Sequence, residues 1–196
     1  HRYTPILEHN SKSDAEKYLR IILDKYKLKS DVMTDLIEPL QEIGSPKKVF
    51  IDGLSIPVSP GSLKYLKIGL DIKEQIGDKK IKTFVEIGCG YGGQAIILSR
   101  LLKIEKYIFI DLWQVNLLIR KFIEDSAFEP NYKISTLGEL DENFMDFDFV
   151  ISNYAFSEMP KKLQNQFFNK IISRSKNGYM IMNSGIAGKF CEINNY

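Results

Sequence analysis

The hydrophobic and polar positions of the chain follow one pattern up to about residue 82 and a different pattern after it. In the first part, apolar residues recur at intervals of about three and four residues, which is the spacing of a helix with one buried face. This spacing predicts helices over residues 13–28, 30–40 and 62–76. Gly77 is expected to end the third of them.

Two short alternating runs within residues 49–56 are joined by Asp52 and Gly53. An Asp-Gly pair between alternating runs is typical of a β-hairpin. We therefore expect residues 1–61 to form a helical extension with a short hairpin, and residues 62–196 to form a second domain.

After residue 82, short apolar runs alternate with helical patterns, which indicates a parallel sheet whose strands are connected by helices. Strands are expected over residues 83–87, 107–110, 132–135, 147–152 and 179–182. Helices are expected to begin near Gly93, after Asp111 and at Pro160. Asn177 and Gly178 are expected to cap the last helix. The second domain is therefore predicted to be an α/β fold with a doubly wound, Rossmann-like sheet.

The composition excludes several classes of protein. With 44% hydrophobic and 27% charged residues, the chain of 196 residues is expected to fold around a core. The net charge is +2 and the 5 arginines are not clustered, so no nucleic-acid partner is expected. No apolar run reaches the roughly 20 residues that span a membrane. Cys89 and Cys191 make no disulfide framework and no signal-peptide pattern is present, which favours the cytoplasm. No metal site is predicted.

The strongest motif lies in residues 84–93, where an apolar run leads into a glycine-rich loop. Gly88, Gly90 and Gly93 satisfy G-x-G-x-x-G, and an apolar helix follows at once. Glycines there allow a tight turn and a close approach of a ligand, and the helix start offers free N–H groups. Asp111 follows 18 residues after the last glycine, as in dinucleotide-binding turns. The sequence therefore predicts a nucleotide-like cofactor, and NAD is one candidate.

The same loop also fits a second cofactor. With Glu86 and Gly92 included it reads E-x-G-x-G-x-G, which resembles the first motif of class I S-adenosylmethionine (SAM)-dependent methyltransferases. Residues 148–158 resemble the motif at the fourth strand of that family. The pair of motifs favours SAM over NAD, because the NAD interpretation gives Glu86 no role.

The resemblance covers about residues 62–183 and implies a class I methyltransferase fold with SAM as its cofactor. It implies that Glu86 orients the amino group of SAM and that Asp111 holds the ribose hydroxyls. The other residues placed at the cofactor are Gly88, Cys89, Gly90 and Gly93 along its path, Leu112, Thr136 and Leu137 beside the adenine, and Asn153 near the sulfonium. Trp113 is expected to pack against its own helix rather than to stack on the adenine.

Within the family, the helical extension and residues 152–160 are most similar to bacterial sugar O-methyltransferases. This narrower resemblance implies methylation of a hydroxyl group on a small molecule or glycan, in particular a surface polysaccharide. A hydroxyl is a poor nucleophile, so a general base would help. The only histidines are His1 and His9, outside the methyltransferase unit, which leaves Glu158 as the candidate base and Tyr154 as a residue that positions the acceptor. An acid at Glu158 also favours the start of the next helix without any catalytic role.

Two other functions remain open at this point. One is a non-catalytic binding or scaffold protein with a methyltransferase fold, which the missing histidine and the short C-terminus favour. The intact glycines, Glu86 and Asp111 oppose it. The other is an NAD-dependent oxidoreductase.

The sheet of the family has seven strands, but only 13 residues follow Asn183, with residues 189–193 as the strand candidate among them. The C-terminal end is therefore expected to be incomplete, through truncation, through the absence of intervening residues, or because a partner completes the sheet. A homo-oligomer formed through the N-terminal extension is a further expectation.

Overall fold

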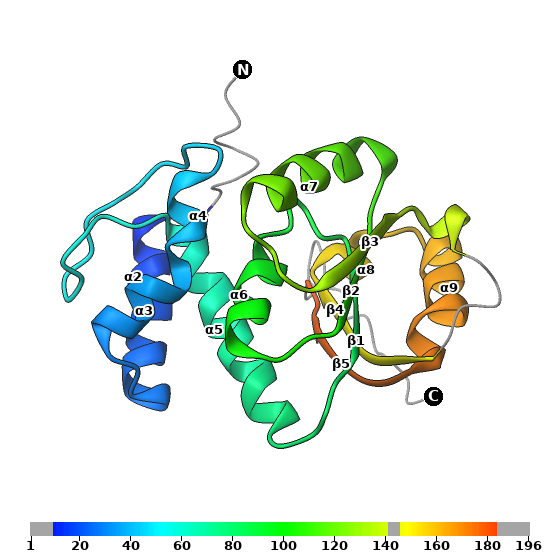
Figure 1. Ribbon diagram of the computed structural model, residues 1–196, viewed down its shortest axis with the longest axis horizontal. Coiled ribbons are helices and arrows are strands. Elements are labelled where there is room, and N and C mark those ends of the chain that lie inside the picture. Colours follow the sequence, from blue (N-terminus) through cyan, green and yellow to red (C-terminus); the bar gives the residue numbers. More distant parts are fainter. Residues whose placement is uncertain (1–9, 141–145, 184–196) are drawn as a thin grey trace.

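Five parallel strands form the centre of the structure, a computed structural model that describes residues 10–140 and 146–183 (Figure 1). The strands are β1 (Thr83–Ile87), β2 (Lys106–Ile110), β3 (Asn131–Ser135), β4 (Phe147–Asn153) and β5 (Ser175–Ile181). Their order in the sheet is β3-β2-β1-β4-β5. The order reverses between β1 and β4, and in open parallel sheets ligands bind outside the carboxyl ends of the strands at such a point.

Helices cover both faces of the sheet. The helices α5 (Pro60–Ile76), α6 (Gly93–Leu101) and α7 (Trp113–Asp125) bury apolar side chains on one face, and α9 (Lys161–Lys170) buries them on the other. Short helical segments are η2 (Leu137–Glu139), α8 (Ala155–Glu158) and η3 (Ile172–Arg174). The predicted α/β, doubly wound, Rossmann-like fold is confirmed. The five expected strands are present as well, and only β5 differs by more than one residue at either end.

The N-terminal helices lie at one end of the molecule, beyond α5 (Figure 1). They are α2 (Lys12–Ile21), the π-helical turn η1 (Ile22–Tyr26), α3 (Ser30–Ile37) and α4 (Pro39–Glu42). The predicted helix over residues 30–40 is therefore two helices, which meet at a proline that lacks the N–H to continue the first. No helix in the described part of the chain is both long and apolar enough to cross a membrane.

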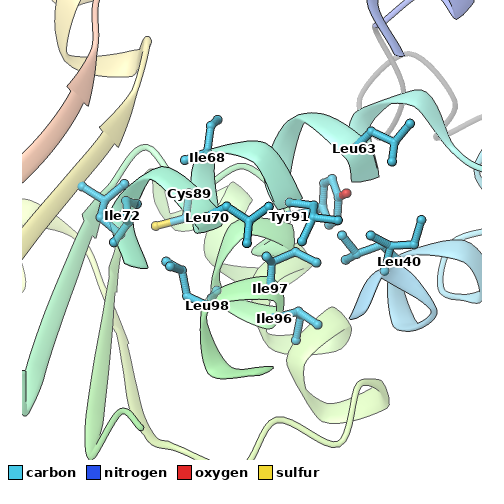
Figure 2. Close-up of a cluster of buried hydrophobic side chains, with 14 of the residues drawn as sticks. Leu40, Leu63, Ile68, Leu70, Ile72, Cys89, Tyr91, Ile96, Ile97 and Leu98 are labelled. Atoms are coloured by element: carbon cyan, nitrogen blue, oxygen red, sulfur yellow. The ribbon is translucent and has the colours of Figure 1, made fainter. Parts of the chain in front are cut away.

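One of the two hydrophobic clusters among the described residues joins these N-terminal helices to the sheet. Leu40 of α4, Leu63 of α5 and Ile97 of α6 belong to one cluster of buried side chains (Figure 2). The same cluster continues to Phe84 and Phe109 of the sheet, both fully buried. Complete burial of each such side chain stabilises the fold by about 1.5–3 kcal/mol. Whether residues 1–61 are a separate domain stays a prediction.

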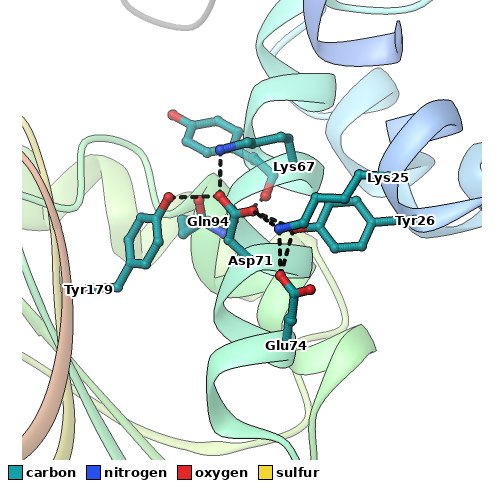
Figure 3. Close-up of polar contacts among 8 residues, drawn as sticks. Lys25, Tyr26, Lys67, Asp71, Glu74, Gln94 and Tyr179 are labelled. Atoms are coloured by element: carbon teal, nitrogen blue, oxygen red, sulfur yellow. Dashed lines mark hydrogen bonds and ion pairs between the residues drawn. The ribbon is translucent and has the colours of Figure 1, made fainter. Parts of the chain in front are cut away.

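A polar cluster makes a second connection between distant parts of the chain (Figure 3). Asp71 of α5 accepts hydrogen bonds from the hydroxyls of Tyr26 in η1 and Tyr179 in β5, the latter at 2.8 Å. Lys67 donates to the same carboxylate, and Lys25 pairs with Glu74 one turn further along α5. One buried helix thus binds both the N-terminal extension and the edge strand of the described sheet.

The hairpin predicted within residues 49–56 is wrong. This segment forms a turn at Asp52 and Gly53, but its only pairing among the described residues is one antiparallel bridge between Val49 and Val58. Ile51 is buried in the core, whereas Phe50 is 70% exposed. An isolated two-stranded hairpin is at best marginally stable in water.

The predicted cap at Asn177 and Gly178 is also wrong. The helix α9 ends at Lys170, and both residues lie within β5. A Cβ atom on Gly178 would lie 2.7 Å from the Val150 side chain, so the glycine permits close contact between two strands. His1, His9, Cys191 and the strand candidate at residues 189–193 lie outside the described residues.

Candidate cofactor site

The glycine loop turns the chain from the end of β1 into α6 by means of backbone conformations that favour glycine. Gly88, Gly90 and Gly92 have φ values of 73°, 57° and 95°. A Cβ atom on Gly88 would lie 2.0 Å from the Cβ of Ala155, whereas one on Gly90 would meet nothing within 4 Å. Gly88 is therefore needed for packing, and Gly90 borders open space that a ligand can enter.

Gly93 has a different role from the one the motif implies. A Cβ atom there would lie 2.7 Å from the ring of Tyr91, which is 5% exposed and packs at right angles to Tyr65. Gly93 makes room for the Tyr91 ring, so its contribution to ligand binding would be indirect.

Asp111 connects the loop to the carboxyl end of the neighbouring strand. Its carboxylate accepts hydrogen bonds from the backbone N–H of Gly90 at 3.2 Å and of Leu112 at 2.8 Å. Partial burial raises its pKa, and the two backbone hydrogen bonds oppose that rise. A carboxylate has about four acceptor positions, so two hydrogen bonds leave room for further donors.

Glu86 lies deeper than the resemblance implies. Its side chain is 2% exposed, and Oε2 accepts a hydrogen bond from the Tyr107 hydroxyl at 2.7 Å. The pKa of this carboxyl is raised to about 8, because burial raises it more than the Tyr107 hydrogen bond lowers it, and the charge of Asp111 adds to the rise. The acid expected to face the amino group of SAM is therefore held inside the fold, with its proton favoured at neutral pH.

Cys89 is 5% exposed, and its thiol donates to the Glu86 carbonyl at 3.2 Å. Burial, together with the nearby acids Glu86 and Asp111, raises the pKa of this thiol. A thiol of this kind stays protonated, and its small side chain fills space within the loop.

A cavity of about 500 Å³ opens beside the loop at the carboxyl ends of the strands. It brings together five of the residues expected to bind the cofactor: Gly88, Asp111, Leu112, Thr136 and Leu137. Its far side is formed by Met159 and by Leu163 and Phe167 of α9. A larger cavity of about 900 Å³ lies at the opposite, amino ends of the strands, lined by residues such as Lys79 and Glu105.

Trp113 also lines the cavity beside the loop and is 61% exposed, and that it packs against its own helix rather than stacking on an adenine stays a prediction. It is the first residue of α7, where the helix has not yet reached the core. Leu112, immediately before it, is 67% exposed.

Asn153 ends β4 and takes part in a network that the sequence did not reveal. Its Nδ2 donates to Oε1 of Gln94 at 3.4 Å, and Gln94 donates from Nε2 to the Tyr65 carbonyl at 3.2 Å. Asn153 Oδ1 is buried and has no hydrogen-bond partner among the described residues. The one available signal for Gln94 was a polar residue immediately before the apolar run of residues 95–98 in α6.

Tyr154 has a φ of 72°, a conformation that is unfavourable for a residue with a side chain. Backbone strain of this kind is about 1–3 kcal/mol and concentrates at functional sites. The backbone N–H donates to the Ile181 carbonyl at 2.7 Å, and the buried Lys64 places Nζ 4.6 Å from the centre of the Tyr154 ring. The strained turn thus directs the ring toward α5.

Glu158, the candidate base, is exposed at the end of α8. Its Oε1 accepts a hydrogen bond from Nδ2 of Asn183 at 2.6 Å, and Ser157 accepts one from the Asn183 backbone at 2.9 Å. The carboxylate therefore holds the segment that follows β5. Within the described ranges no three metal-ligating side chains are grouped so as to hold an ion.

No protein-family model matches the sequence, and no curated protein matches it. Solved structures match at low identity. A Thermoplasma acidophilum protein is 17% identical, with a TM-score of 0.52 over 78% of this chain and 70% of its own. A Methanococcus maripaludis protein assigned as a SAM-dependent methyltransferase is 14% identical, with a TM-score of 0.51 over 78% and 63%.

Mycolic acid cyclopropane synthase, crystallised with S-adenosylhomocysteine (SAH) and CTAB, is 11% identical, with a TM-score of 0.50 over 87% of this chain and 55% of its own. The chain thus spans between 55% and 70% of the lengths of these three proteins. At such identities the likeness establishes the fold. The described part of the chain has the Rossmann-like fold of the class I SAM-dependent methyltransferases.

Proposed function

We propose that the protein transfers a methyl group from SAM to a hydroxyl group, in particular one of a sugar. The observation that carries the proposal is the loop between β1 and α6. Gly90 borders open space, and its N–H is held against the Asp111 carboxylate at the end of the next strand. The E-x-G-x-G-x-G motif and the methyltransferase fold support SAM as the ligand of this loop. The sugar hydroxyl rests on the narrower sequence resemblance.

The described residues fit SAM at three points. Asp111 has acceptor positions left for the two ribose hydroxyls. The cavity of about 500 Å³ is lined mainly by apolar residues such as Leu112 and Leu137, which suits an adenine ring. The buried Asn153 Oδ1 provides an acceptor for a polar hydrogen of the ligand.

When bound, SAM supplies a methyl group already activated by its sulfonium, so the protein contributes mainly orientation. In the proposed site, Asp111 accepts hydrogen bonds from the ribose, while Leu112, Thr136 and Leu137 enclose the adenine. Gly88 and Gly90 let the ligand approach the backbone, and Cys89 and Gly93 keep the loop in shape.

Glu158 is the proposed base for the acceptor hydroxyl, and Tyr154 is the proposed contact that positions the acceptor. A carboxylate has two oxygens, and the Asn183 hydrogen bond uses one position on Oε1. The strained backbone of Tyr154 supports a functional role for its side chain.

Thermal unfolding with SAM, SAH or NAD tests the cofactor. A ligand present at 100 times its dissociation constant stabilises the folded state by about 2.7 kcal/mol and raises the midpoint by a few degrees. We expect this rise with SAM and SAH but not with NAD, and we expect Asp111→Ala to abolish it. Asp125→Ala is the matched control, because this exposed acid pairs with Lys121 on the far part of α7. A rise with NAD alone would contradict the proposal.

Transfer of a labelled methyl group from SAM to free sugars and sugar nucleotides tests the acceptor. A binding protein without catalysis is the second candidate, and the exposed position of Glu158 against Asn183 favours it. That candidate predicts stabilisation by SAM and no transfer to any hydroxyl compound.

The proposal extends to location and partners. The low cysteine content supports a reducing compartment, the cytoplasm, as the proposed location of the reaction. The proposed partners are a glycan or small-molecule acceptor and a second copy of the chain bound through the N-terminal helices.

A further inference from the structure

A chain of hydrogen bonds joins the Tyr65 carbonyl of α5, the Gln94 side chain of α6 and Asn153 at the end of β4. The Tyr65 carbonyl fixes which atoms donate and which accept. The Tyr65 carbonyl can only accept, so the Gln94 atom 3.2 Å from it is the donating Nε2. The Oε1 of Gln94, which is 1% exposed, then faces Asn153. Asn153 must present its own donor, Nδ2, to that oxygen. Its acceptor Oδ1 is left buried without a partner in the described part of the chain.

The strand register places this acceptor beside the glycine loop. Glu86 of β1 is opposite Ile151 of β4, so Asn153, two residues further, is level with Gly88. The Ser152 hydroxyl donates to the Ile87 carbonyl at 3.0 Å, which agrees with this alignment of β4 and β1. Residues two apart in a strand share a face. Asn153 therefore lies on the same face as Glu86 and nearer the carboxyl edge.

On this face of the sheet, Asn153 lies between Glu86 and the carboxyl edge. The Glu86 carboxyl lies below, 2% exposed and hydrogen-bonded through Oε2 to Tyr107. A buried acceptor without a donor is unfavourable, and an isolated case in a native fold calls for a physical reason. An ammonium group offers three donors and no acceptor, so it can satisfy Asn153 Oδ1 but cannot accept from Nδ2.

We propose that Asn153 Oδ1 accepts a hydrogen bond from the ammonium group of the amino acid end of SAM, and that Gln94 is the positioning residue that fixes the Asn153 amide in this orientation. The assignment rests on the proposed cofactor. Without Gln94, the Asn153 amide is free to turn and to present its donor to the cation, which is repulsive. Glu86 then supports the fold from below and does not itself bind the amino group.

Calorimetric titration with two ligands tests this assignment. SAH has the amino acid end, and 5′-methylthioadenosine lacks it while keeping the adenosine. We expect Gln94→Leu and Asn153→Ala each to weaken SAH binding about tenfold, the magnitude of one hydrogen bond to a charged group. Binding of 5′-methylthioadenosine should stay within about twofold of wild type, which also shows that each variant is folded.

Two further variants separate positioning from packing. Gln94→Glu is the conservative variant: at pH 6 its buried, protonated carboxyl can donate to the Tyr65 carbonyl and accept from Asn153, so SAH binding should return to within about threefold of wild type. Gln75→Leu is the matched control, because Gln75 also donates to a backbone carbonyl, that of Gly178 at 3.2 Å, without an asparagine partner. It should leave both affinities unchanged.

Unchanged SAH binding in Gln94→Leu and Asn153→Ala would overturn the inference. So would an equal loss for both ligands, since that indicates a general disturbance of the site. If the wild type bound neither ligand, the proposed function would fail first, and the inference would fail with it.

Discussion

At the scale of single residues, Glu86 is an acid that the fold holds in its core. Burial raises its pKa to about 8, with Asp111 adding to the rise and Tyr107 opposing it, whereas the ordinary value is 4.5. Between these two values the folded protein keeps a proton that the unfolded chain has lost. Raising the pH through this range therefore favours unfolding, and the loss of stability is complete above about pH 8.

The variant Glu86→Gln removes this ionisation and keeps an acceptor for the Tyr107 hydroxyl. We expect it to exceed the wild type in free energy of unfolding at pH 9 by a few kcal/mol, at about 1.4 kcal/mol per unit of pKa shift, and to equal it near pH 4. Urea unfolding at the two pH values measures the difference. The exposed Glu42→Gln is the control, and parallel pH profiles for Glu86→Gln and wild type would refute the explanation.

At the scale of elements, the loop between β1 and α6 contains glycines with separate functions. Gly88 and Gly90 both have positive φ, so alanine is strained at either position. Only at Gly88 would the added methyl group collide with protein, at 2.0 Å from Ala155. At Gly90 it would project into the space assigned to the ligand.

We therefore expect Gly88→Ala to destabilise the fold by more than about 2 kcal/mol, because the collision adds to the backbone strain, and Gly90→Ala by only about 1 kcal/mol. Gly90→Ala should nevertheless bind SAH at least tenfold more weakly than the wild type. Chemical unfolding and calorimetry measure the two effects. Wild-type affinity in Gly90→Ala would mean that no ligand approaches the backbone there.

The strands and the loop could be predicted from the sequence, because burial on both faces produces apolar runs and a tight turn requires glycine. The hairpin at residues 49–56 could not be excluded, since an Asp-Gly turn forms whether or not a sheet follows. The depth of Glu86 was also hidden. It depends on Tyr107, which lies 21 residues away in the chain and beside it only through strand pairing.

The hydrogen bonds at Asn153 also depend on contacts between distant parts of the chain, which the sequence does not reveal. The motif indicated the asparagine, but Gln94 reaches it only once α6 has packed beside β4 and α5. The position of Trp113 depends on where α7 begins to bury its apolar face, which the periodicity does not fix. Local patterns thus predicted the positions of the elements. Contacts between elements determined the burial and the hydrogen bonds of the site residues at their ends.

At the scale of the whole molecule, the polar cluster at Asp71 joins three parts of the chain (Figure 3). Burial raises the pKa of Asp71, but hydrogen bonds from Lys67, Tyr26 and Tyr179 outweigh it, and the net pKa is lowered. A lowered pKa means that the carboxylate contributes stability above its ordinary value of 3.8. That stability is lost as the pH falls through the folded pKa.

We expect Asp71→Asn to lower the free energy of unfolding by about 1–3 kcal/mol at pH 7, because the groups that donate to Asp71 lose a charged acceptor. The difference from wild type should decrease as the pH falls below 3.8 and disappear once the pH is below the folded pKa. Glu105→Gln is the control, since its exposed ion pair with Lys80 should contribute at most about 1 kcal/mol. A deficit in Asp71→Asn that persists unchanged at pH 3 would show that the charge is not what stabilises the cluster.

Trp113 gives the molecule a practical property. It is the only tryptophan of the chain, and it stands largely exposed on the wall of the cavity beside the glycine loop. Its indole fluorescence therefore reports on that cavity without interference from a second tryptophan. An adenine ring that displaces water from it will change the emission, so ligand association and release can be followed in real time on the unlabelled protein, before any acceptor has been identified.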